Sequence, residues 1–179
     1  MIEQEIEKKA LLTEAQYEIL LNKVTGHPIK KTNQINYYYD TENYAMLSNN
    51  ETLRVRQIEN HLELHFKHDK KTYNCVRVSK ELCEELQCLP EMISINGLFA
   101  NYTGFLLTER TIIKLNMFTI FLDKNYYMGK VDYEIEIEAV NICDMPKKLF
   151  GIIFNSDCNG KYTRFVAELL KQRGCYEIS

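Results

Sequence analysis

The sequence predicts an α+β fold in which about eight antiparallel strands close into a barrel, with helices packed outside it. Alternation of period two recurs along the chain, which is typical of strands whose two faces differ. Charged residues occupy one face of these strands and apolar residues the other. The 179 residues, 45 % of them apolar, are enough for one domain with a core and too few for two full enzyme domains. We therefore expect a single domain over residues 1–179.

The expected elements of the first half follow from local patterns. Residues 2–9 alternate, and we expect a helix over 13–24, where Thr13 and Gln16 are spaced as a capping box. Short alternating runs predict the next four strands, with a turn at 40–51 and two helical segments after the last strand. The strands are expected at 34–40, 53–58, 62–68 and 73–79, and the helical segments at 81–89 and 98–102.

The second half repeats this strand pattern. We expect strands at 105–115, 118–123 and 130–140, with a hairpin turn at 123–129 between the last two. Two helices are expected to follow, at 145–154 and at 162–173, the second ended by Gly174.

Net charge and cysteine content limit the classes of partner and compartment. Lys and Arg total 22 against 25 Asp and Glu, so there is no overall basic field to indicate nucleic acid. The first ten residues lack the apolar core of a signal peptide, and no apolar run reaches the ~20 residues of a membrane span. We therefore expect a cytoplasmic, reduced protein whose cysteines are buried structural thiols. The cysteines are Cys75, Cys83, Cys88, Cys143, Cys158 and Cys175.

The apolar faces of the strands can be covered by helices from outside, which turns the charged faces inward. A barrel of about eight strands can hold one small ligand in its interior. Unpaired buried charges cost several kcal/mol each, so an interior of this kind implies pairing or a charged ligand. The expected interior carries six acids (Glu5, Glu7, Asp123, Glu134, Glu136 and Glu138) and six bases (Lys9, Arg54, Arg56, Lys67, Arg110 and Lys161).

The chemistry of these two sets points to one kind of ligand. Hard divalent cations such as Mg²⁺ or Mn²⁺ prefer carboxylate oxygens, whereas phosphoryl oxygens prefer Arg and Lys. A polyphosphate complexed with a divalent cation would satisfy both sets together.

The chain also resembles a known family in the order of its motifs. These are Glu5-Ile6-Glu7-Lys8-Lys9, Tyr39-Asp40-Thr41, Leu53-Arg54-Val55-Arg56, Leu64-His65-Phe66-Lys67, Arg110, Leu122-Asp123, Gly129, Glu134-Ile135-Glu136-Ile137-Glu138 and Lys161 in GKYTRF. They span residues 3 to 165 and resemble the CYTH proteins, or triphosphate tunnel metalloenzymes, which include class IV adenylate cyclase and thiamine triphosphatase. The tyrosine-rich strand and the KYTRF ending look most like the small stand-alone CYTH proteins of Gram-positive bacteria.

The resemblance implies a metal-dependent hydrolase of inorganic triphosphate, thiamine triphosphate or a nucleoside triphosphate, with Mg²⁺ or Mn²⁺ as cofactor. It implies a small-molecule substrate, with neither nucleic acid nor membrane as partner, and is compatible with a homodimer. Metal binding is implied for Glu5, Glu7, Asp123, Glu134, Glu136 and Glu138. Phosphate binding is implied for Lys9, Arg54, Arg56, Lys67, Arg110 and Lys161, and catalytic roles for Glu136, Lys9 and Lys161.

One departure from the family pattern keeps other functions open. Family members usually carry a glutamate on the strand after the Leu-x-x-Lys motif, where this sequence has Arg77 and Ser79, and Glu81 could substitute after a register shift. The alternatives are an adenylate cyclase of the class IV type, a polyphosphate or nucleotide sensor that binds without turnover, and a structural barrel with salt-bridged strands.

Several other residues are expected to be structural or solvated. We expect His27, His61, His65 and His68 at the surface or in loops, and Lys70 and Lys71 in a solvated turn. Tyr37, Tyr38 and Tyr39 are expected to pack within their strand. Arg164 is expected either to pair with a carboxylate near Lys161 or to cover the last helix.

Overall fold

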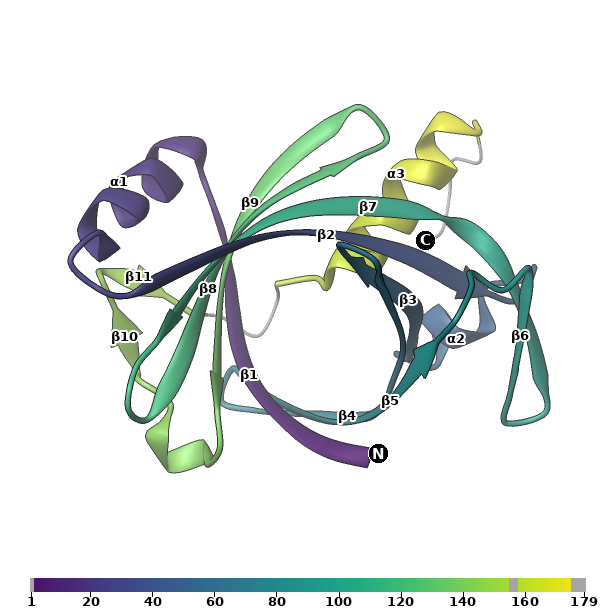
Figure 1. Ribbon diagram of the computed structural model, residues 1–179, viewed down its shortest axis with the longest axis horizontal. Coiled ribbons are helices and arrows are strands. Elements are labelled where there is room, and N and C mark those ends of the chain that lie inside the picture. Colours follow the sequence, from purple (N-terminus) through teal and green to yellow (C-terminus); the bar gives the residue numbers. More distant parts are fainter. Residues whose placement is uncertain (1, 155–157, 175–179) are drawn as a thin grey trace.

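The computed structural model describes residues 2–154 and 158–174, and Cys175 lies outside these ranges. The described residues form a curved antiparallel sheet with three helices around it (Figure 1). The strands are β1 (Ile2–Leu12), β2 (Ile29–Asp40), β3 (Thr52–Ile58), β4 (His61–Tyr73), β5 (Val76–Leu86), β6 (Met92–Ile95), β7 (Leu98–Lys114), β8 (Phe118–Tyr127), β9 (Lys130–Ala139), β10 (Lys148–Leu149) and β11 (Ile152–Ile153). The helices are α1 (Glu14–Val24), α2 (Ala45–Ser48) and α3 (Lys161–Gln172), with a 3-10 turn at Ile142–Asp144.

The barrel is closed by pairing between its second and seventh strands. The strand order is β2-β3-β4-β5-β1-β9-β8-β7, and β7 pairs antiparallel with β2 to complete the ring, which confirms the predicted fold class. In this order β3 and β9 are separated by three strands on either side, so they form opposite walls. Strand β6 lies outside the ring and pairs only with β7 as a protruding hairpin.

The register places the charged positions of neighbouring strands beside one another on the inner face. Glu7 pairs with Glu138 and Lys9 with Glu136 across β1 and β9. Because directly opposed residues point to the same side of a sheet, the charged alternation of each strand is brought to a common interior.

Helix α1 covers the outer face of β1, β8 and β9. Its N-terminus has the predicted capping box, in which Thr13 accepts from the Gln16 backbone N–H and the Gln16 side chain accepts from the Thr13 N–H. Tyr17, Leu20 and Val24 are buried against the apolar outer residues of these strands. The helix predicted from the capping box and the apolar stripe is therefore confirmed.

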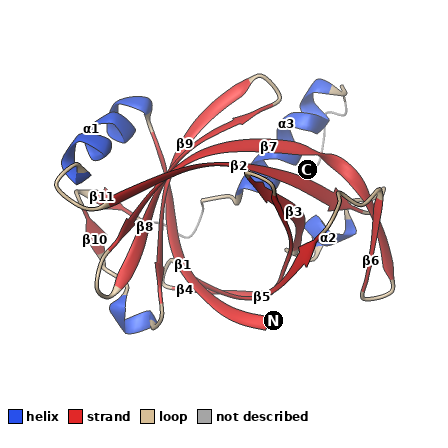
Figure 2. Cartoon of the chain, viewed as in Figure 1, coloured by secondary structure: helices blue, strands red, loops and turns tan. Residues whose placement is uncertain are grey.

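Helix α3 lies across one end of the barrel rather than on its outer surface (Figure 2). Phe165 packs on Tyr38, with their ring centroids 5.5 Å apart, and Tyr38 points into the barrel. Gly104 makes this approach possible, because a Cβ there would lie 2.5 Å from the Phe165 ring. No helix within the described ranges is both long and apolar enough to cross a membrane.

Three expected helical segments are wrong. Residues 81–86 continue strand β5 and residues 98–102 begin β7. The Glu- and Leu-rich sequence of 81–86 favours a helix locally, but pairing with β4 up to Leu86 overrides that weak preference. The segment 145–154 contains the β10–β11 hairpin, whose turn residues Phe150 and Gly151 have φ of 51° and 85°, as a two-residue hairpin turn requires.

Several other predicted strands are present but are longer than predicted. Strands β2, β4, β7 and β8 extend beyond their predicted ranges, and the predicted turn at 40–51 contains the short helix α2. The predicted hairpin at 123–129 narrows to a turn at Met128 and Gly129, which have φ of 49° and 76°.

Candidate active site

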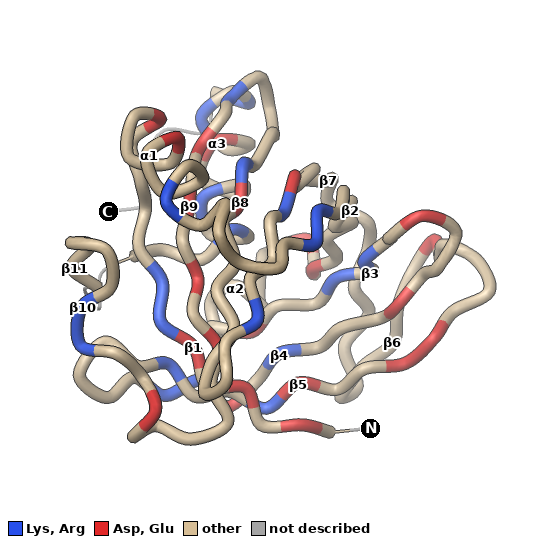
Figure 3. The backbone as a smooth tube through the Cα atoms, turned by 60° about the vertical axis from the view of Figure 1, so that its left-hand side comes forward, with Lys and Arg blue, Asp and Glu red and all other residues tan. Residues whose placement is uncertain are grey.

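The inner faces of the strands line a cavity of approximately 850 Å³. All of the residues predicted for the site border it except Asp123 and Glu134, which are completely buried behind its wall. Figure 3 marks where basic and acidic positions lie along the strands that form it. The structure thus brings both predicted sets into one interior.

Glu136, on β9, is the centre of the ionic network. One carboxylate oxygen lies 2.9 Å from Lys9 Nζ and 3.1 Å from Lys161 Nζ, and the other lies 2.6 Å from Arg110 Nη2. Burial alone would raise the pKa of Glu136, but Lys161, Lys9 and Arg110 together hold it well below its usual range. Glu136 is therefore ionised at neutral pH and shared by three cations.

Asp123 and Glu134 hold two of these cations in place from behind. Arg110 donates two hydrogen bonds to Asp123, at 2.8 and 2.6 Å, and Lys161 Nζ lies 2.6 Å from Glu134 Oε1. Oxygens of Asp123, Glu134 and Glu136 lie within 4.8 Å of one another, close enough to share a cation. In this arrangement, however, Arg110 and Lys161 already contact them.

Arg164, one turn into α3, reinforces the same corner. It donates to Glu134 Oε2 at 2.7 Å and to Asp132 Oδ2 at 2.8 Å. The expected pairing of Arg164 with a carboxylate near Lys161 is confirmed.

A group of carboxylates at one end of the cavity is incompletely matched by cations. Glu5 pairs with Lys67 at 2.6 Å and accepts a hydrogen bond from Ser79 Oγ at 3.2 Å, and Glu7 pairs with Lys9 at 2.9 Å. Glu138 has no ion pair within the part of the chain that is described. Burial and then the nearby Glu5 raise the pKa of Glu138 to about 7. This end of the cavity therefore favours an added cation.

The wall opposite β9 has the reverse imbalance. Within the described residues, Arg56, on β3, forms no ion pair with a carboxylate and donates only to Asn36 Oδ1, at 3.3 Å. Burial, followed by repulsion from Arg54 and Arg110, lowers the pKa of Arg56 to about 10. The Nε atom of Arg54 is buried and has no hydrogen-bond partner among the described residues. This wall therefore favours an added anion.

Lys70 adds to the positive charge of the cavity, and its predicted position in a solvated turn is wrong. It lies in β4 and lines the cavity, with Nζ 2.8 Å from Thr52 Oγ1, whereas a solvated turn was expected. Burial and then Lys67 lower the pKa of Lys70 to about 8. Lys71 is exposed, as expected for a solvated residue, although it too lies in β4.

The strand that departs from the family pattern supplies an acid after all. Arg77, Ser79 and Glu81 all line the cavity from β5, and Arg77 donates to the Cys158 carbonyl. Glu81 opposes Lys67 on β4, next to a register shift in the β4–β5 pairing between His68 and Lys71, and lies 3.4 Å from Arg54 Nη2. Burial would raise the pKa of Glu81, but Lys67, His65 and Arg54 lower it far below its usual value. Glu81 thus lies in the place suggested for it from the sequence, although in a strand and not in the helix expected at 81–89.

Some expectations for histidine and cysteine are also wrong. His65 is buried on the inner face of β4, where a surface or loop position was expected, whereas His27 and His61 are exposed. Cys158 is buried, but Cys88 and Cys143 are exposed, contrary to the expectation of buried thiols. None of the described cysteines is in a disulfide. Tyr38 and Tyr39 are fully buried and pack as predicted.

Comparison with known proteins agrees with this architecture. The family model described as "CYTH domain" matches residues 3–149. A curated protein of Bacillus subtilis strain 168, described as "Putative triphosphatase YjbK", is 27 % identical over 149 residues, which cover 76 % of this chain and 78 % of that protein.

Two solved structures share the fold over nearly the whole chain. A protein of Bacillus halodurans, described as a "putative adenylate cyclase", superposes with a TM-score of 0.63 at 20 % identity, covering 99 % of this chain and 94 % of that one. HpAC1 of Hippeastrum, described as a "putative adenylyl cyclase" with a dominant triphosphatase activity, gives a TM-score of 0.63 at 18 % identity and covers 98 % and 91 %.

Proposed function

The chain belongs to the CYTH domain family, and from this membership and the charges in its cavity we propose that it is an enzyme that hydrolyses a triphosphate with a divalent cation as cofactor. The substrate is a small molecule held inside the barrel, and Mg²⁺ or Mn²⁺ is the cation. The described relative from Bacillus subtilis, whose name refers to a triphosphatase, supports the same reaction class.

One observation carries the proposal: opposite walls of one cavity have unmatched charges of opposite sign. Arg56 on β3 has no carboxylate partner, and Glu138 on β9 has no cationic partner among the described residues. A structural barrel would place such groups together, because pairing them would offset the cost of burying each. A metal-complexed polyphosphate supplies a cation for one wall and an anion for the other.

The carboxylates at the Glu138 end fit a hard divalent cation. Glu5, Glu7 and Glu138 offer only oxygen donors, and burial and Glu5 raise the pKa of Glu138 more than Lys67 and Arg110 lower it. A cation held there would draw charge away from the phosphoryl oxygens of the substrate. We propose that these three residues, with Glu136, provide the main ligands, while Asp123 and Glu134 act chiefly by fixing Arg110 and Lys161.

The bases then position the phosphoryl groups. Arg54, Arg56 and Lys67 present donors from β3 and β4, and Arg110 presents them from β7. Guanidinium groups bind phosphate oxygens with two parallel hydrogen bonds, which fixes orientation as well as supplying charge. Hydrolysis of a phosphoanhydride needs little covalent chemistry from a protein, so alignment and charge stabilisation are the main contributions.

Glu136, Lys9 and Lys161 have the catalytic roles in this proposal. The shared carboxylate holds both ammonium groups at the centre of the cavity, where they would stabilise charge that develops on the transferred group or the leaving group. Their positions are set before substrate binds, which avoids a reorganisation cost during the reaction.

The test is a product assay with inorganic triphosphate, thiamine triphosphate and ATP, each with Mg²⁺ or Mn²⁺. We expect release of orthophosphate and a diphosphate product, with loss of roughly 100-fold or more in Glu136→Gln. Glu84→Gln, at an exposed position of β5, is the matched control and should retain activity. Formation of pyrophosphate and cyclic AMP from ATP would replace the proposal with a cyclase, and tight binding without product would replace it with a sensor.

A further inference from the structure

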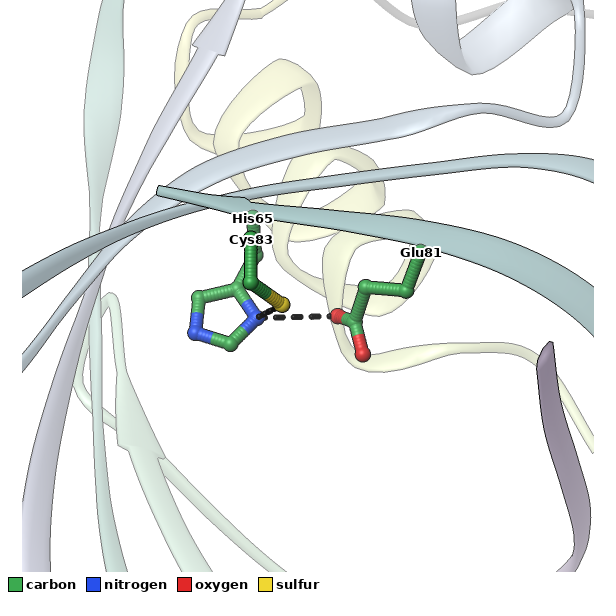
Figure 4. A group of neighbouring side chains, drawn as sticks. All are labelled: His65, Glu81 and Cys83. Carbon is green, nitrogen blue, oxygen red and sulfur yellow. Dashed lines mark hydrogen bonds and ion pairs between the residues drawn. The ribbon is translucent and has the colours of Figure 1, made fainter. Parts of the chain in front are cut away.

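A second group of potential metal ligands lies beside the cavity on the inner face of β4 and β5. It consists of His65, Glu81 and Cys83 (Figure 4). His65 Nδ1 lies 3.0 Å from Glu81 Oε1 and 3.4 Å from Cys83 Sγ. Glu81 borders the cavity, whereas His65 and Cys83 lie beyond its lining. The three donors are one nitrogen, one oxygen and one sulfur, unlike the all-oxygen set at Glu138.

The spacing of these atoms is close to that of a tetrahedral site. With Zn–N near ~2.0 Å and Zn–S near ~2.3 Å, tetrahedral angles place N and S about 3.6 Å apart and N and O about 3.3 Å apart. The observed distances of 3.4 and 3.0 Å are therefore shorter by only a few tenths of an ångström. A small outward movement of the side chains would open the site for a cation.

The histidine is also oriented as metal ligands usually are. Its other ring nitrogen, Nε2, lies 3.1 Å from Glu63 Oε2, two residues earlier on the same face of β4. A metal on Nδ1 requires the ring proton to be on Nε2, where the Glu63 carboxylate is placed to accept it. Glu63 thus completes an outer shell around the three donors.

We propose that His65, Glu81 and Cys83 bind a borderline-soft divalent cation of the Zn²⁺ type, with Glu63 as the positioning residue for His65. A thiolate and an imidazole select such a cation over Mg²⁺, which prefers oxygen ligands. The site is separate from the Glu138 end of the cavity and requires no triphosphate, so it does not depend on the proposed hydrolysis.

Binding would change the state of two of the ligands. The Cys83 thiol keeps its proton in the cation-free protein, because burial and then Glu81 and Glu63 raise its pKa to about 11. A coordinating thiol loses that proton to solvent as the metal–sulfur bond forms. Glu81 would turn an oxygen from Arg54 and Lys67, which lie 3.4 and 3.9 Å away, toward the cation.

Co²⁺ is a suitable probe, because its absorption reports both thiolate ligation and tetrahedral geometry. Titration of the wild-type protein at pH 8 should give a thiolate-to-Co²⁺ charge-transfer band together with visible bands, and one equivalent of Zn²⁺ should remove them. A large excess of Mg²⁺ should leave them unchanged. Absence of the band in the wild type, or its displacement by Mg²⁺, would overturn the proposal.

Variants identify the ligands. Cys83→Ser should abolish the charge-transfer band, whereas Cys88→Ser, which alters an exposed thiol, should retain it. Glu63→Gln should retain the band but weaken Co²⁺ binding by roughly 10-fold, as expected for an outer-shell partner. Far-UV circular dichroism and a melting curve verify that each variant is folded. A band that persists in folded Cys83→Ser would show that another cysteine binds the metal and would refute the site.

Discussion

The unmatched acid at Glu138 leads to a prediction about stability as well as function. The folded structure raises the pKa of Glu138 from 4.5 to about 7, first by burial and then by repulsion from Glu5. At about 1.36 kcal/mol for each pKa unit, the ionised carboxylate costs the ligand-free fold about 3 kcal/mol at neutral pH. Glu138→Gln removes the charge and keeps the shape. We therefore expect the variant to be more stable than the wild type at neutral pH.

The pH dependence fixes the sign of this effect. Unfolded Glu138 ionises near pH 4.5 and folded Glu138 near pH 7, so the wild type loses stability as pH rises through this window and the loss is complete above it. Denaturant unfolding in a chelator at pH 5, 6, 7 and 8 should therefore show a growing advantage for Glu138→Gln. Glu84→Gln, exposed on β5, should show no such trend.

Adding Mg²⁺ should reduce the advantage of Glu138→Gln, because a bound cation stabilises the ionised wild-type carboxylate and so favours the folded wild type. A stability difference that is constant from pH 5 to 8, or insensitive to Mg²⁺, would refute the reasoning.

Three further predictions follow from the cavity and from helix α3. Arg56→Met should weaken triphosphate binding by roughly 10-fold or more, which corresponds to the loss of one charge-assisted hydrogen bond. It should not lower the unfolding free energy of the ligand-free protein, because Arg56 is buried there at a cost. Calorimetry measures the affinity and denaturation the stability, and an unchanged affinity would count against the basic wall. Chelation of divalent cations should abolish hydrolysis and added Mg²⁺ or Mn²⁺ should restore it, whereas full activity in chelator would exclude a metal-dependent reaction. Gly104→Ala should destabilise the fold by roughly 1–3 kcal/mol, since its Cβ would lie 2.5 Å from the Phe165 ring, and Gly160→Ala, whose nearest contact is 4.0 Å away, should cost less in the same melting experiment.

The barrel was predictable because the alternation of charged and apolar residues assigns each residue to one face of its strand. Once Ile135 and Ile137 occupy one face of a strand, Glu134, Glu136 and Glu138 must occupy the other. Outer helices with apolar stripes then decide which face is inside. The strand order that sets β3 opposite β9 could not be read in this way, because it depends on pairings between segments far apart in sequence.

The missed parts of the site on β4 and β5, other than Lys70, share one cause. A helix at 81–89 would take Cys83 out of the interior and leave His65 without the residue that opposes it on β5. The alternation of Val76 and Val78 continues at Leu82, and this signal could have extended the strand. In this segment the period of the apolar residues is a better guide than local helix preference.

The sequence could not predict which of the acids border the cavity and which are fully buried. Asp123 and Glu134 have the same alternating pattern as Glu136, yet they are sealed behind the cavity wall. Both acids contact Lys161, which α3 carries into the barrel from a segment distant in sequence. The packing of that helix, which local sequence does not specify, contributes to which acids remain accessible.

The coupling between cation and triphosphate is the most direct test of the central claim that the two walls bind one metal-complexed polyphosphate. The measurement is calorimetric titration of the wild type with a non-hydrolysable imido analogue of triphosphate, in chelator and in saturating Mg²⁺, alongside Glu138→Gln and Arg56→Met. We expect Mg²⁺ to tighten binding to the wild type at least about 10-fold, with the gain reduced in Glu138→Gln and weak binding under both conditions in Arg56→Met. Equal affinity with and without Mg²⁺, or wild-type affinity in both variants, would contradict the claim.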